Sequence, residues 1–274
     1  MTDIEFLSSL RACDPLFGTL IVSTSPVWPK VIQSIGLDYV FLDTEHIALD
    51  RSCLSWMCRT YRALGIPPIV RITSPDPYLV TVALDDAAAG VLVPYIESAD
   101  QVRALVGAAK YRPLKGQKLQ AVLNQQETVG GTLAEYLKKA NAGNSLILNI
   151  ESVPGMKNLD SILRVDGVDG IIIGPHDLST SLEVPEQYDH PKFIAAVDEI
   201  IEKARAAGVS AGIHAGFNQQ IHTAAQIRWM QRGANLILHA GDIIAFQQTM
   251  QRDIATLREG LGQSIAKDEV LVNI

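Results

Sequence analysis

Two acidic residues, each following a short apolar segment, are the clearest candidates for metal chemistry in this chain. Glu151 directly follows residues 146–150, and Asp177 lies shortly after residues 170–173. A short apolar run that stops in polar residues is typical of a strand buried on both faces. Two carboxylates held close together suit a hard divalent cation such as Mg²⁺ or Mn²⁺. We therefore expect Glu151 and Asp177 to form a metal site.

The segment between the two apolar runs indicates why the carboxylates should meet. Residues 153–164 carry apolar side chains at helical spacing. A strand, a helix and a second strand in this order form a right-handed crossover, which makes the two strands parallel neighbours. Both carboxylates then lie at the carboxyl-terminal edge of one sheet, where ligands bind in parallel α/β folds.

The rest of the chain repeats this alternation of strand and helix. We expect eight strands, each followed by a helix, at residues 17–22, 39–42, 68–70, 91–93, 146–150, 170–173, 209–213 and 236–238. Regular alternation over roughly 250 residues is typical of a (β/α)8 barrel, or TIM barrel. We therefore predict one barrel domain spanning residues 1–274. The alternative is an open doubly wound sheet, but the Gly-rich motif expected after its first strand is missing.

Composition and charge exclude several classes of protein. The formal net charge is −7 and no basic stripe is present, which argues against a nucleic-acid partner. No apolar run approaches the ~20 residues that span a bilayer, and the first residues lack the pattern of a secretory signal. The three cysteines, Cys13, Cys53 and Cys58, show no CxxC spacing. We expect reduced thiols and a cytoplasmic protein.

Polar or charged residues follow most of the predicted strands. They are Ser23, Asp43, Glu45, His46, Arg71, Glu151, Asp177, His214 and His239. In a barrel these side chains converge on one cavity. Any one of them alone could be a turn former, a helix cap or half of an ion pair, but the set together favours a functional site. For His214 and His239 we expect packing at the rim rather than metal ligation.

Five motifs in this set resemble those of a known family. They are DTEH at 43–46, VR at 70–71, VP at 93–94, NIES at 149–152 and GPHDLS at 174–179. In their order and spacing, over residues 16–241, the chain resembles the HpcH/HpaI aldolases, which are class II, metal-dependent pyruvate aldolases. The resemblance implies that Glu151 and Asp177 hold Mg²⁺, Mn²⁺ or Co²⁺, with water completing the shell. Such a metal stabilises the enolate of pyruvate or a related 2-keto acid.

The resemblance also implies roles for residues around the metal. Arg71 would place positive charge against the keto or enolate oxygen, and His46 would be the acid–base group. Asp43 would orient the His46 imidazole. The residues implied in substrate binding are Gly174, Pro175, His176, Asn149 and Arg71. A homo-oligomer, with a hexamer as the typical form, would be built by docking the C-terminal helix on a neighbour.

Four features depart from the family pattern. Residues 112–131 have no clear period and lack the expected Gly- and Arg-rich stretch that contributes to the active site. Asn149 replaces a glutamine, His176 a small residue and His214 an aliphatic residue. These changes bear on the substrate more than on the metal. His176 could narrow the pocket, supply a second acid–base group or add a metal contact.

The sequence therefore predicts a carbon–carbon lyase, namely an aldolase of 4-hydroxy-2-keto acids that acts through a pyruvate enolate. Its partners would be a 2-keto acid of the pyruvate or oxaloacetate class and an aldehyde or keto-acid acceptor. One alternative is a synthase or an oxaloacetate decarboxylase-type enzyme, with residues 112–131 shaping the pocket. Another is a barrel that binds a metabolite without turnover. A CoA-ester lyase is disfavoured because no basic patch is present for the CoA phosphates.

Overall fold

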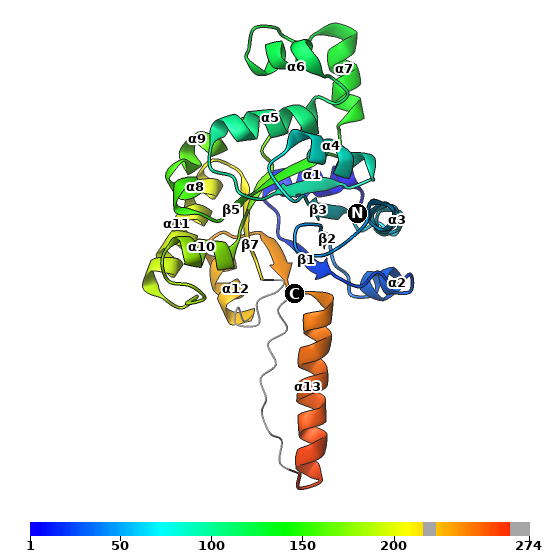
Figure 1. Cartoon of the computed structure of the whole chain (residues 1–274), viewed down its shortest axis with the longest axis vertical. Coiled ribbons are helices and arrows are strands. Elements are labelled where there is room, and N and C mark those ends of the chain that lie inside the picture. The colour runs from blue at the N-terminus through cyan, green and yellow to red at the C-terminus, as the bar shows by residue number, and fades with distance from the viewer. Residues whose placement is uncertain (216–222, 264–274) are drawn as a thin grey trace.

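The computed structural model describes residues 1–215 and 223–263 and has the predicted architecture (Figure 1). Eight parallel strands pair in sequence order and close into a barrel, because β1 also pairs with β8. The strands are β1 (Leu16–Ile21), β2 (Tyr39–Asp43), β3 (Pro68–Arg71), β4 (Gly90–Val93), β5 (Ser145–Ile150), β6 (Gly170–Ile173), β7 (Ser210–His214) and β8 (Leu236–His239). The prediction of a (β/α)8 barrel is confirmed.

Helices surround the barrel. The first seven are α1 (Asp3–Ala12), α2 (Trp28–Gln33), α3 (Arg51–Ala63), α4 (Pro77–Asp85), α5 (Ala99–Lys110), α6 (Gly116–Leu123) and α7 (Gly131–Ala140). The others are α8 (Val153–Lys157), α9 (Leu159–Leu163), α10 (Pro175–Ser181), α11 (Pro191–Ala206), α12 (Thr223–Gln231) and α13 (Asp242–Gly260). None of the described helices is both long and apolar enough to cross a lipid bilayer.

Alternation along each strand divides the core into two layers. Odd-numbered residues of β2 and β3, such as Phe41 and Ile69, belong to a small cluster inside the barrel, whereas even-numbered residues such as Val40 and Val70 belong to the larger layer under the helices. Because strand side chains alternate with period two, Asp43 and Arg71 share the inward-facing position of Phe41 and Ile69. The inward face of the strands therefore delivers polar side chains to the carboxyl-terminal end.

Helix α1 closes the amino-terminal end of the barrel. Its Phe6 and Leu10 belong to the inner cluster, and the Phe6 ring lies 5.6 Å from that of Tyr39. Gly18 gives the Tyr39 ring its space, because a Cβ at this position would lie 2.4 Å from the ring. Apolar packing thus fills the interior at this end of the barrel.

Two helical regions differ from prediction. The helix expected over residues 153–164 is divided at Asn158 into α8 and α9. The residues directly after β6, which carry the motif GPHDLS, form an additional short helix, α10. It starts at Pro175, and proline is preferred at the first helical position because its missing N–H leaves no helical bond unmade.

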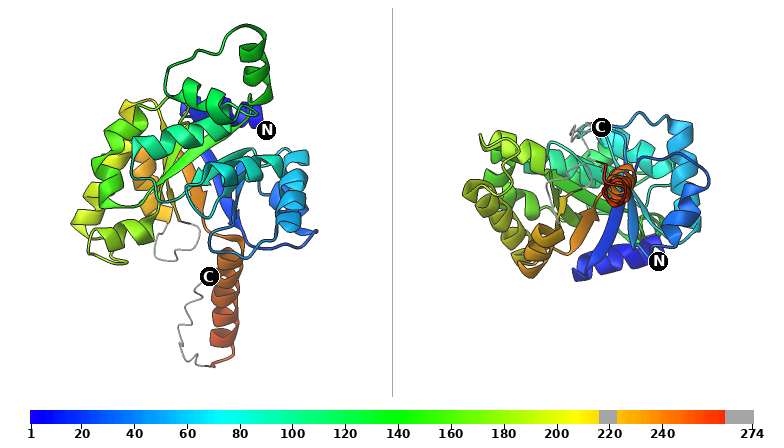
Figure 2. Two further views of the ribbon diagram at one scale, coloured as in Figure 1. Left: turned by 45° about the horizontal axis from the view of Figure 1, so that its top comes forward. Right: turned by 90° about the horizontal axis from the view of Figure 1, so that it is seen from below.

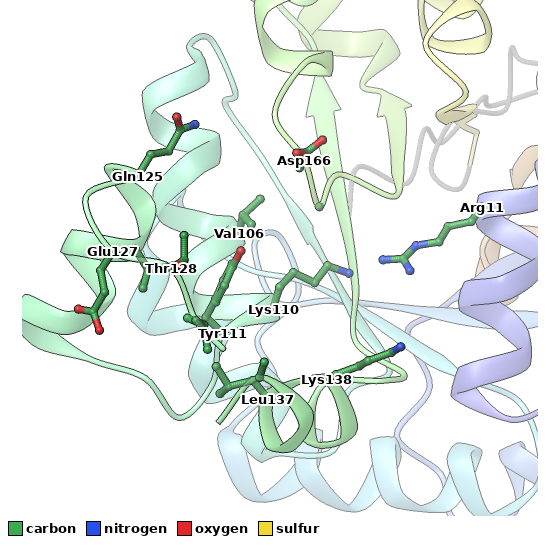
Figure 3. Close-up of a pocket in the computed structure, with 14 residues that line it drawn as sticks. Arg11, Val106, Lys110, Tyr111, Gln125, Glu127, Thr128, Leu137, Lys138 and Asp166 are labelled. Atoms are coloured by element: carbon green, nitrogen blue, oxygen red, sulfur yellow. The ribbon is translucent and has the colours of Figure 1, made fainter. Parts of the chain in front are cut away.

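Residues 112–131 also differ from prediction, both in structure and in position. They contain α6 and the first residue of α7, and they lie at the amino-terminal end of the barrel, beyond the end of α5 (Figure 1). There they line a cavity of about 560 Å³ together with Arg11, Lys110 and Asp166 (Figure 3). The predicted contribution of this segment to the active site is therefore not made within one chain, because the rim residues lie at the other end.

Helix α13 starts at the rim and then leaves the barrel. The Asp242 carboxylate accepts the N–H groups of Val22 and Ser23, each at 3.0 Å, which anchors the start of α13 to the end of β1. Figures 1 and 2 show the rest of α13 projecting away from the barrel. Its exposed apolar side chains are Phe246, Met250, Ile254 and Leu257, with Leu261 just after the helix. This spacing places them on one face.

Candidate active site

Asp43 and Arg71 form a buried ion pair at the carboxyl-terminal rim. Each is the last residue of its strand, and the parallel register puts them directly opposite each other. Arg71 donates from Nε to Asp43 Oδ1 at 2.8 Å and from Nη2 to Oδ2 at 2.6 Å. Burial acts to raise the pKa of Asp43, but these hydrogen bonds outweigh it and hold the pKa below its usual value. Asp43 is therefore ionised at neutral pH.

Glu45 is a second anionic partner of the same guanidinium. Its Oε2 lies 3.1 Å from Arg71 Nε, and its backbone N–H donates to Asp43 Oδ1 at 3.0 Å. The guanidinium carbon also lies 5.7 Å from the centroid of the Phe41 ring, a distance typical of a cation–π contact. Two carboxylates and an aromatic ring thus fix the orientation of Arg71.

His46 is separated from Asp43, contrary to the predicted pairing. Its Nε2 is 3.9 Å from Glu45 Oε2, and its side chain is 48% exposed. Both Asp43 oxygens are occupied by Arg71, because strand register makes these two residues neighbours, whereas His46 lies in the loop beyond β2. The structure corrects the predicted contact: Asp43 orients Arg71, and Glu45 is the carboxylate nearest to His46.

Glu151 is held just beyond β5 by two donors. The Tyr95 N–H donates to its Oε1 at 2.7 Å, and Asn149 Nδ2 donates to its Oε2 at 2.7 Å. Burial raises the pKa of Glu151, and these hydrogen bonds oppose that rise, while the charges of Asp177 and Glu45 add to it. Negative charge is therefore concentrated around this carboxylate.

Gly174 provides the space that Glu151 occupies. The register pairs Ile150 with Ile173, so the next residue of each strand, Glu151 and Gly174, lie side by side. A Cβ on Gly174 would lie 2.4 Å from Glu151 Oε2 and 3.0 Å from Glu151 Cβ. The resemblance implies a role for Gly174 in substrate binding; in the structure the Glu151 side chain makes the close approach at this glycine.

The predicted ligand Asp177 and its neighbour His176 are exposed on the first turn of α10. The charge of Asp177 contributes to the raised pKa of Glu151, so the two predicted metal ligands belong to the same part of the rim. His176 Nδ1 lies 3.5 Å from Glu186 Oε1, and this surface contact directs its ring toward the loop after α10. Pro175 is buried and has no N–H, so in this turn the candidate backbone donors are Gly174 and His176.

Asn149 and His214 complete the buried part of the rim. Asn149 Oδ1 is buried and has no hydrogen-bond partner among the described residues. The His214 ring packs against Phe41 with centroids 5.2 Å apart, as its predicted packing role requires. Burial, assisted by the charge of Arg71, lowers the pKa of His214 to about 3, so the ring is neutral at neutral pH. His239 contacts Gln226 at 3.0 Å and lies at the rim as predicted.

Tyr95 is the rim residue that the sequence reasoning missed. It follows Pro94 just beyond β4, and its phenol interacts with Glu45, which is the main cause that raises the pKa of Tyr95 to about 12. The rule that identified the other rim residues, a polar group just after a strand, would have identified Tyr95 had it been extended past Pro94.

The donor set at this rim fits a hard divalent cation. Three carboxylates, those of Asp43, Glu45 and Glu151, act on the guanidinium of Arg71, and a fourth, Asp177, acts on Glu151. Within the described ranges, no three His, Cys, Asp or Glu side chains are grouped to hold a metal. A cation here would take two protein carboxylates and otherwise water or substrate oxygens, which is how Mg²⁺ commonly binds.

Comparison with known proteins identifies the family to which the chain is similar. The family model described as HpcH/HpaI aldolase/citrate lyase matches residues 17–235. The chain is 29% identical over 262 residues to the 2-keto-3-deoxy-L-rhamnonate aldolase of Salmonella gallinarum, covering 96% of each chain. This similarity extends over nearly the whole protein.

Solved structures give the same result. An HpcH/HpaI aldolase from Desulfitobacterium hafniense DCB-2 superposes with a TM-score of 0.77 at 29% identity, covering 92% of this chain and 96% of that one. The citrate synthase SbnG superposes with a TM-score of 0.78 at 26% identity, covering 94% and 98%. The predicted family and the predicted class, a carbon–carbon lyase of the aldolase type, are confirmed. The chain belongs to the HpcH/HpaI aldolase/citrate lyase family.

Proposed function

We propose that this chain is a divalent-metal-dependent aldolase that cleaves or forms the C3–C4 bond of a 4-hydroxy-2-keto acid through a pyruvate enolate. The observation that carries the proposal is the set of charged side chains at the rim. Buried Glu151 is held by two hydrogen bonds at 2.7 Å, and the charge of Asp177 acts on it. Asp43 fixes Arg71 with two hydrogen bonds at the same rim. Excess carboxylate charge needs a cation, and a fixed guanidinium beside it suits a reaction in which negative charge develops on oxygen.

Glu151 and Asp177 are the residues that would hold the cation. A bound Mg²⁺, Mn²⁺ or Co²⁺ supplies Lewis acidity toward the carboxylate and keto oxygens of a 2-keto acid. The citrate lyase beta subunit of M. tuberculosis, which shares the barrel fold at 18% identity and a TM-score of 0.54, is known complexed with oxaloacetate and magnesium. That complex shows that a barrel of this fold can bind a divalent ion together with a 2-keto acid.

Arg71 stabilises the negative charge on the keto oxygen as the C3–C4 bond breaks. Its Nε and Nη2 are held by Asp43, so no reorientation is needed when that charge develops. Asp43 thus acts on the reaction through Arg71. Lysine could not reproduce this arrangement, because it lacks the planar fork that binds a carboxylate with two parallel hydrogen bonds.

His46 is the proposed acid–base group. It is half exposed at the rim, and its nearest recorded partner is the Glu45 carboxylate at 3.9 Å. Removing the proton from the 4-hydroxyl group during cleavage, and returning it during condensation, needs an acid–base group that can reach the substrate. The exposed imidazole of His46 at the rim is the proposed group.

The carboxylate of the substrate has candidate donors at the start of α10. The Gly174 and His176 N–H groups lie in the first turn, beside Glu151. Asn149, whose amide nitrogen is taken by Glu151, supports the metal ligand rather than the substrate. For His176, the contact with Glu186 favours a role at the pocket entrance rather than as a metal contact.

The substrate class that we propose is a 3-deoxy-2-keto sugar acid, because the Salmonella relative is named for 2-keto-3-deoxy-L-rhamnonate. A synthase that joins a pyruvate-type enolate to a keto acid is the second candidate, supported by the similarity to the citrate synthase SbnG. Both reactions use the same enolate, and they differ in the electrophile.

We also propose that the chain forms a homo-oligomer through α13. The exposed face formed by Phe246, Met250, Ile254 and Leu257 projects away from its own barrel, and a second copy of the chain is the partner that would cover it. Light scattering at micromolar concentration should give a multiple of the chain mass, and Phe246→Glu with Leu257→Glu should reduce it. A monomeric wild type would refute this assembly.

Exchange of the pyruvate methyl protons into D₂O, followed by NMR, tests the proposed function directly. With Mg²⁺, Mn²⁺ or Co²⁺ the wild type should exchange these protons, and Glu151→Gln should not. The matched control is Glu199→Gln, which changes an exposed carboxylate on α11. Pyruvate binding without exchange under all three metals would favour the metabolite-binding alternative and overturn the proposal. A panel of aldehydes and keto acids added with pyruvate then separates aldolase from synthase.

A further inference from the structure

Glu97, in the loop between β4 and α5, is bonded to both ends of the short helix α8. Ser152, the residue that caps the start of α8, donates from Oγ to Glu97 Oε1 at 2.6 Å. Asn158, the residue at the end of α8, donates from Nδ2 to the Glu97 carbonyl oxygen at 2.7 Å. The side chain and the backbone of Glu97 therefore each hold one end of the helix that directly follows Glu151.

Gly155 allows α8 to lie this close to the loop. A Cβ at Gly155 would lie 2.7 Å from the Ile96 carbonyl oxygen, which is closer than real Cβ atoms come to backbone. Glycine is an unfavourable residue inside a helix. Its presence within α8 is therefore explained by the close approach of Ile96.

The same loop carries one of the two donors that hold Glu151. The Tyr95 N–H donates to Glu151 Oε1 at 2.7 Å, and the φ of Tyr95 is 56°, in the left-handed region that disfavours residues carrying a Cβ. Such a conformation persists only where the surrounding structure enforces it. Two residues further along, Glu97 is fixed by Ser152 and Asn158, and its N–H donates to Gln101 Oε1 at 2.9 Å. These bonds restrain the chain that follows Tyr95.

We propose that Glu97 is a positioning residue for Glu151, which keeps the Tyr95 N–H directed at Glu151 Oε1 by binding the loop to α8. Without the side chain of Glu97, the loop is free to relax toward an ordinary φ at Tyr95. Glu151 would then keep only its hydrogen bond from Asn149. This inference rests on the proposed function, since it takes Glu151 as a metal ligand.

Titration with Mn²⁺, followed by electron paramagnetic resonance, tests this role without turnover. We expect Glu97→Ala to raise the Kd for Mn²⁺ about 10-fold or more, the usual effect of losing an outer partner of a metal ligand. Glu97→Gln removes the charge but keeps an oxygen that can accept from Ser152, so its Kd should stay within about threefold of the wild type. Glu199→Ala, at an exposed glutamate on α11, is the matched control and should bind Mn²⁺ as the wild type does.

Two results of this titration would overturn the proposal. Wild-type affinity in Glu97→Ala would mean that the loop holds its place without this side chain. An equal loss in Glu97→Gln would mean that Glu97 acts on the cation through its charge rather than through the bond from Ser152.

Gly155→Ala tests the same contact from the side of α8. The new Cβ would force the Ile96 carbonyl away, so we expect a rise in the Kd for Mn²⁺ similar to that of Glu97→Ala. A purely structural contact would lower the melting temperature and leave the Kd of the folded protein unchanged. That outcome, in Gly155→Ala and Glu97→Ala together, would also overturn the proposal.

A double-mutant cycle tests whether Glu97 acts through Ser152. In the Ser152→Ala background, Glu97→Ala should change the Kd for Mn²⁺ by no more than about twofold. Persistence of its full effect there would overturn the proposed route. Ser152 also accepts the Gly155 N–H at 3.1 Å, so Ser152→Ala should in addition lower the melting temperature.

These measurements separate the role of Glu97 from the proposed function. If the wild type binds Mn²⁺ but fails to exchange pyruvate protons, and Glu97→Ala still weakens Mn²⁺ binding, the proposed function fails and Glu97 keeps its positioning role. If the wild type exchanges these protons and Glu97→Ala matches it in both kcat and Kd for Mn²⁺, the role of Glu97 fails alone.

Discussion

The barrel carries a charged cluster at each end, and the two clusters differ in whether each buried carboxylate has a cationic partner; we call the end where it does the balanced end. At the amino-terminal end, Asp169 accepts Arg11 Nε at 2.8 Å, the Leu146 N–H at 2.8 Å and the ammonium of Lys110. Lys110 also donates to the Asn144 carbonyl. A single buried carboxylate thus has two cations and an amide donor, and the cluster joins α1, α5 and the start of β6.

At the carboxyl-terminal end the carboxylates outnumber the cations. Three carboxylates act on Arg71 and Asp177 adds a fourth negative charge beside Glu151. The Asn149 amide oxygen is buried without a partner among the described residues, and the backbone of Tyr95 has a left-handed φ. A cluster whose charges are satisfied is explained by stability, whereas a cluster left incomplete indicates a ligand that completes it.

The position of the cavity shows why shape alone does not locate the site. The cavity of about 560 Å³ lies at the balanced end, where Lys110 and Arg11 line it but are already paired with Asp169 (Figure 3). The chemistry that we propose takes place at the other end, where carboxylates lack cationic partners.

The largest expected effect comes from removing a ligand at the unbalanced end. Glu151→Gln and Asp177→Asn should each lower metal-dependent turnover about 1000-fold or more, because several kcal/mol of charge stabilisation are lost. Neither should lower the unfolding free energy by more than about 1 kcal/mol, since each substitution relieves repulsion among carboxylates. Turnover assays and urea titrations measure the two effects. Full activity in either variant would refute the ligand assignment.

The mirror-image experiment at the balanced end should affect stability instead. Asp169→Asn leaves Arg11 and Lys110 without their counter-charge, and we expect a loss of about 3–5 kcal/mol in unfolding free energy. Turnover per folded molecule should stay within about twofold of the wild type, since the cluster lies at the far end of the barrel. A large loss of turnover in fully folded protein would contradict the division between the two ends.

Substitution of Arg71 tests whether turnover requires the planar guanidinium or only a positive charge at this position. Arg71→Lys keeps the positive charge but cannot bind both Asp43 oxygens in parallel, so we expect turnover to fall about 100-fold. The Mn²⁺ affinity should change little, because the ligands stay in place. Equal turnover in the lysine variant would mean that a positive charge without the planar fork is sufficient.

His214 offers a smaller effect, visible in the pH dependence of stability. Its pKa of about 3 in the folded chain is far below the ordinary 6.5, so the unfolded chain takes up a proton that the folded chain does not. As pH falls below 6.5, His214 should therefore cost up to about 1.4 kcal/mol of stability per pH unit. Urea titrations from pH 7 to 5 should show a shallower fall for His214→Leu. If His214→Leu leaves the slope of unfolding free energy against pH unchanged, another titratable group causes the loss of stability at low pH.

Most of the fold was predictable because parallel barrel strands are short apolar runs that end in polar residues. That pattern located all eight strands and placed Glu151 next to the segment that carries Asp177. The helices at 112–131 and at α10 were missed, because short polar helices such as α6, which buries no side chain, lack an apolar stripe. Part of the helix predicted over residues 218–231 lies outside the described residues.

The sequence predicted which residues lie at the site, but not which of their side chains contact one another. Residue types after the strands identified Asp43, Arg71 and Glu151, but the contact of Asp43 with Arg71 rather than His46 follows from strand register, which a single sequence does not specify. The hydrogen bond from Tyr95 to Glu151 uses a backbone N–H and a left-handed φ, and neither can be read from the residue type.

Titration with Mn²⁺, followed by electron paramagnetic resonance, tests the central claim most directly, that the negative charge left over at the rim belongs to one divalent cation. The account predicts one tightly bound ion per chain in the wild type and in Asp169→Asn, and its loss in Glu151→Gln and Asp177→Asn. Binding of wild-type strength in both rim variants would contradict it.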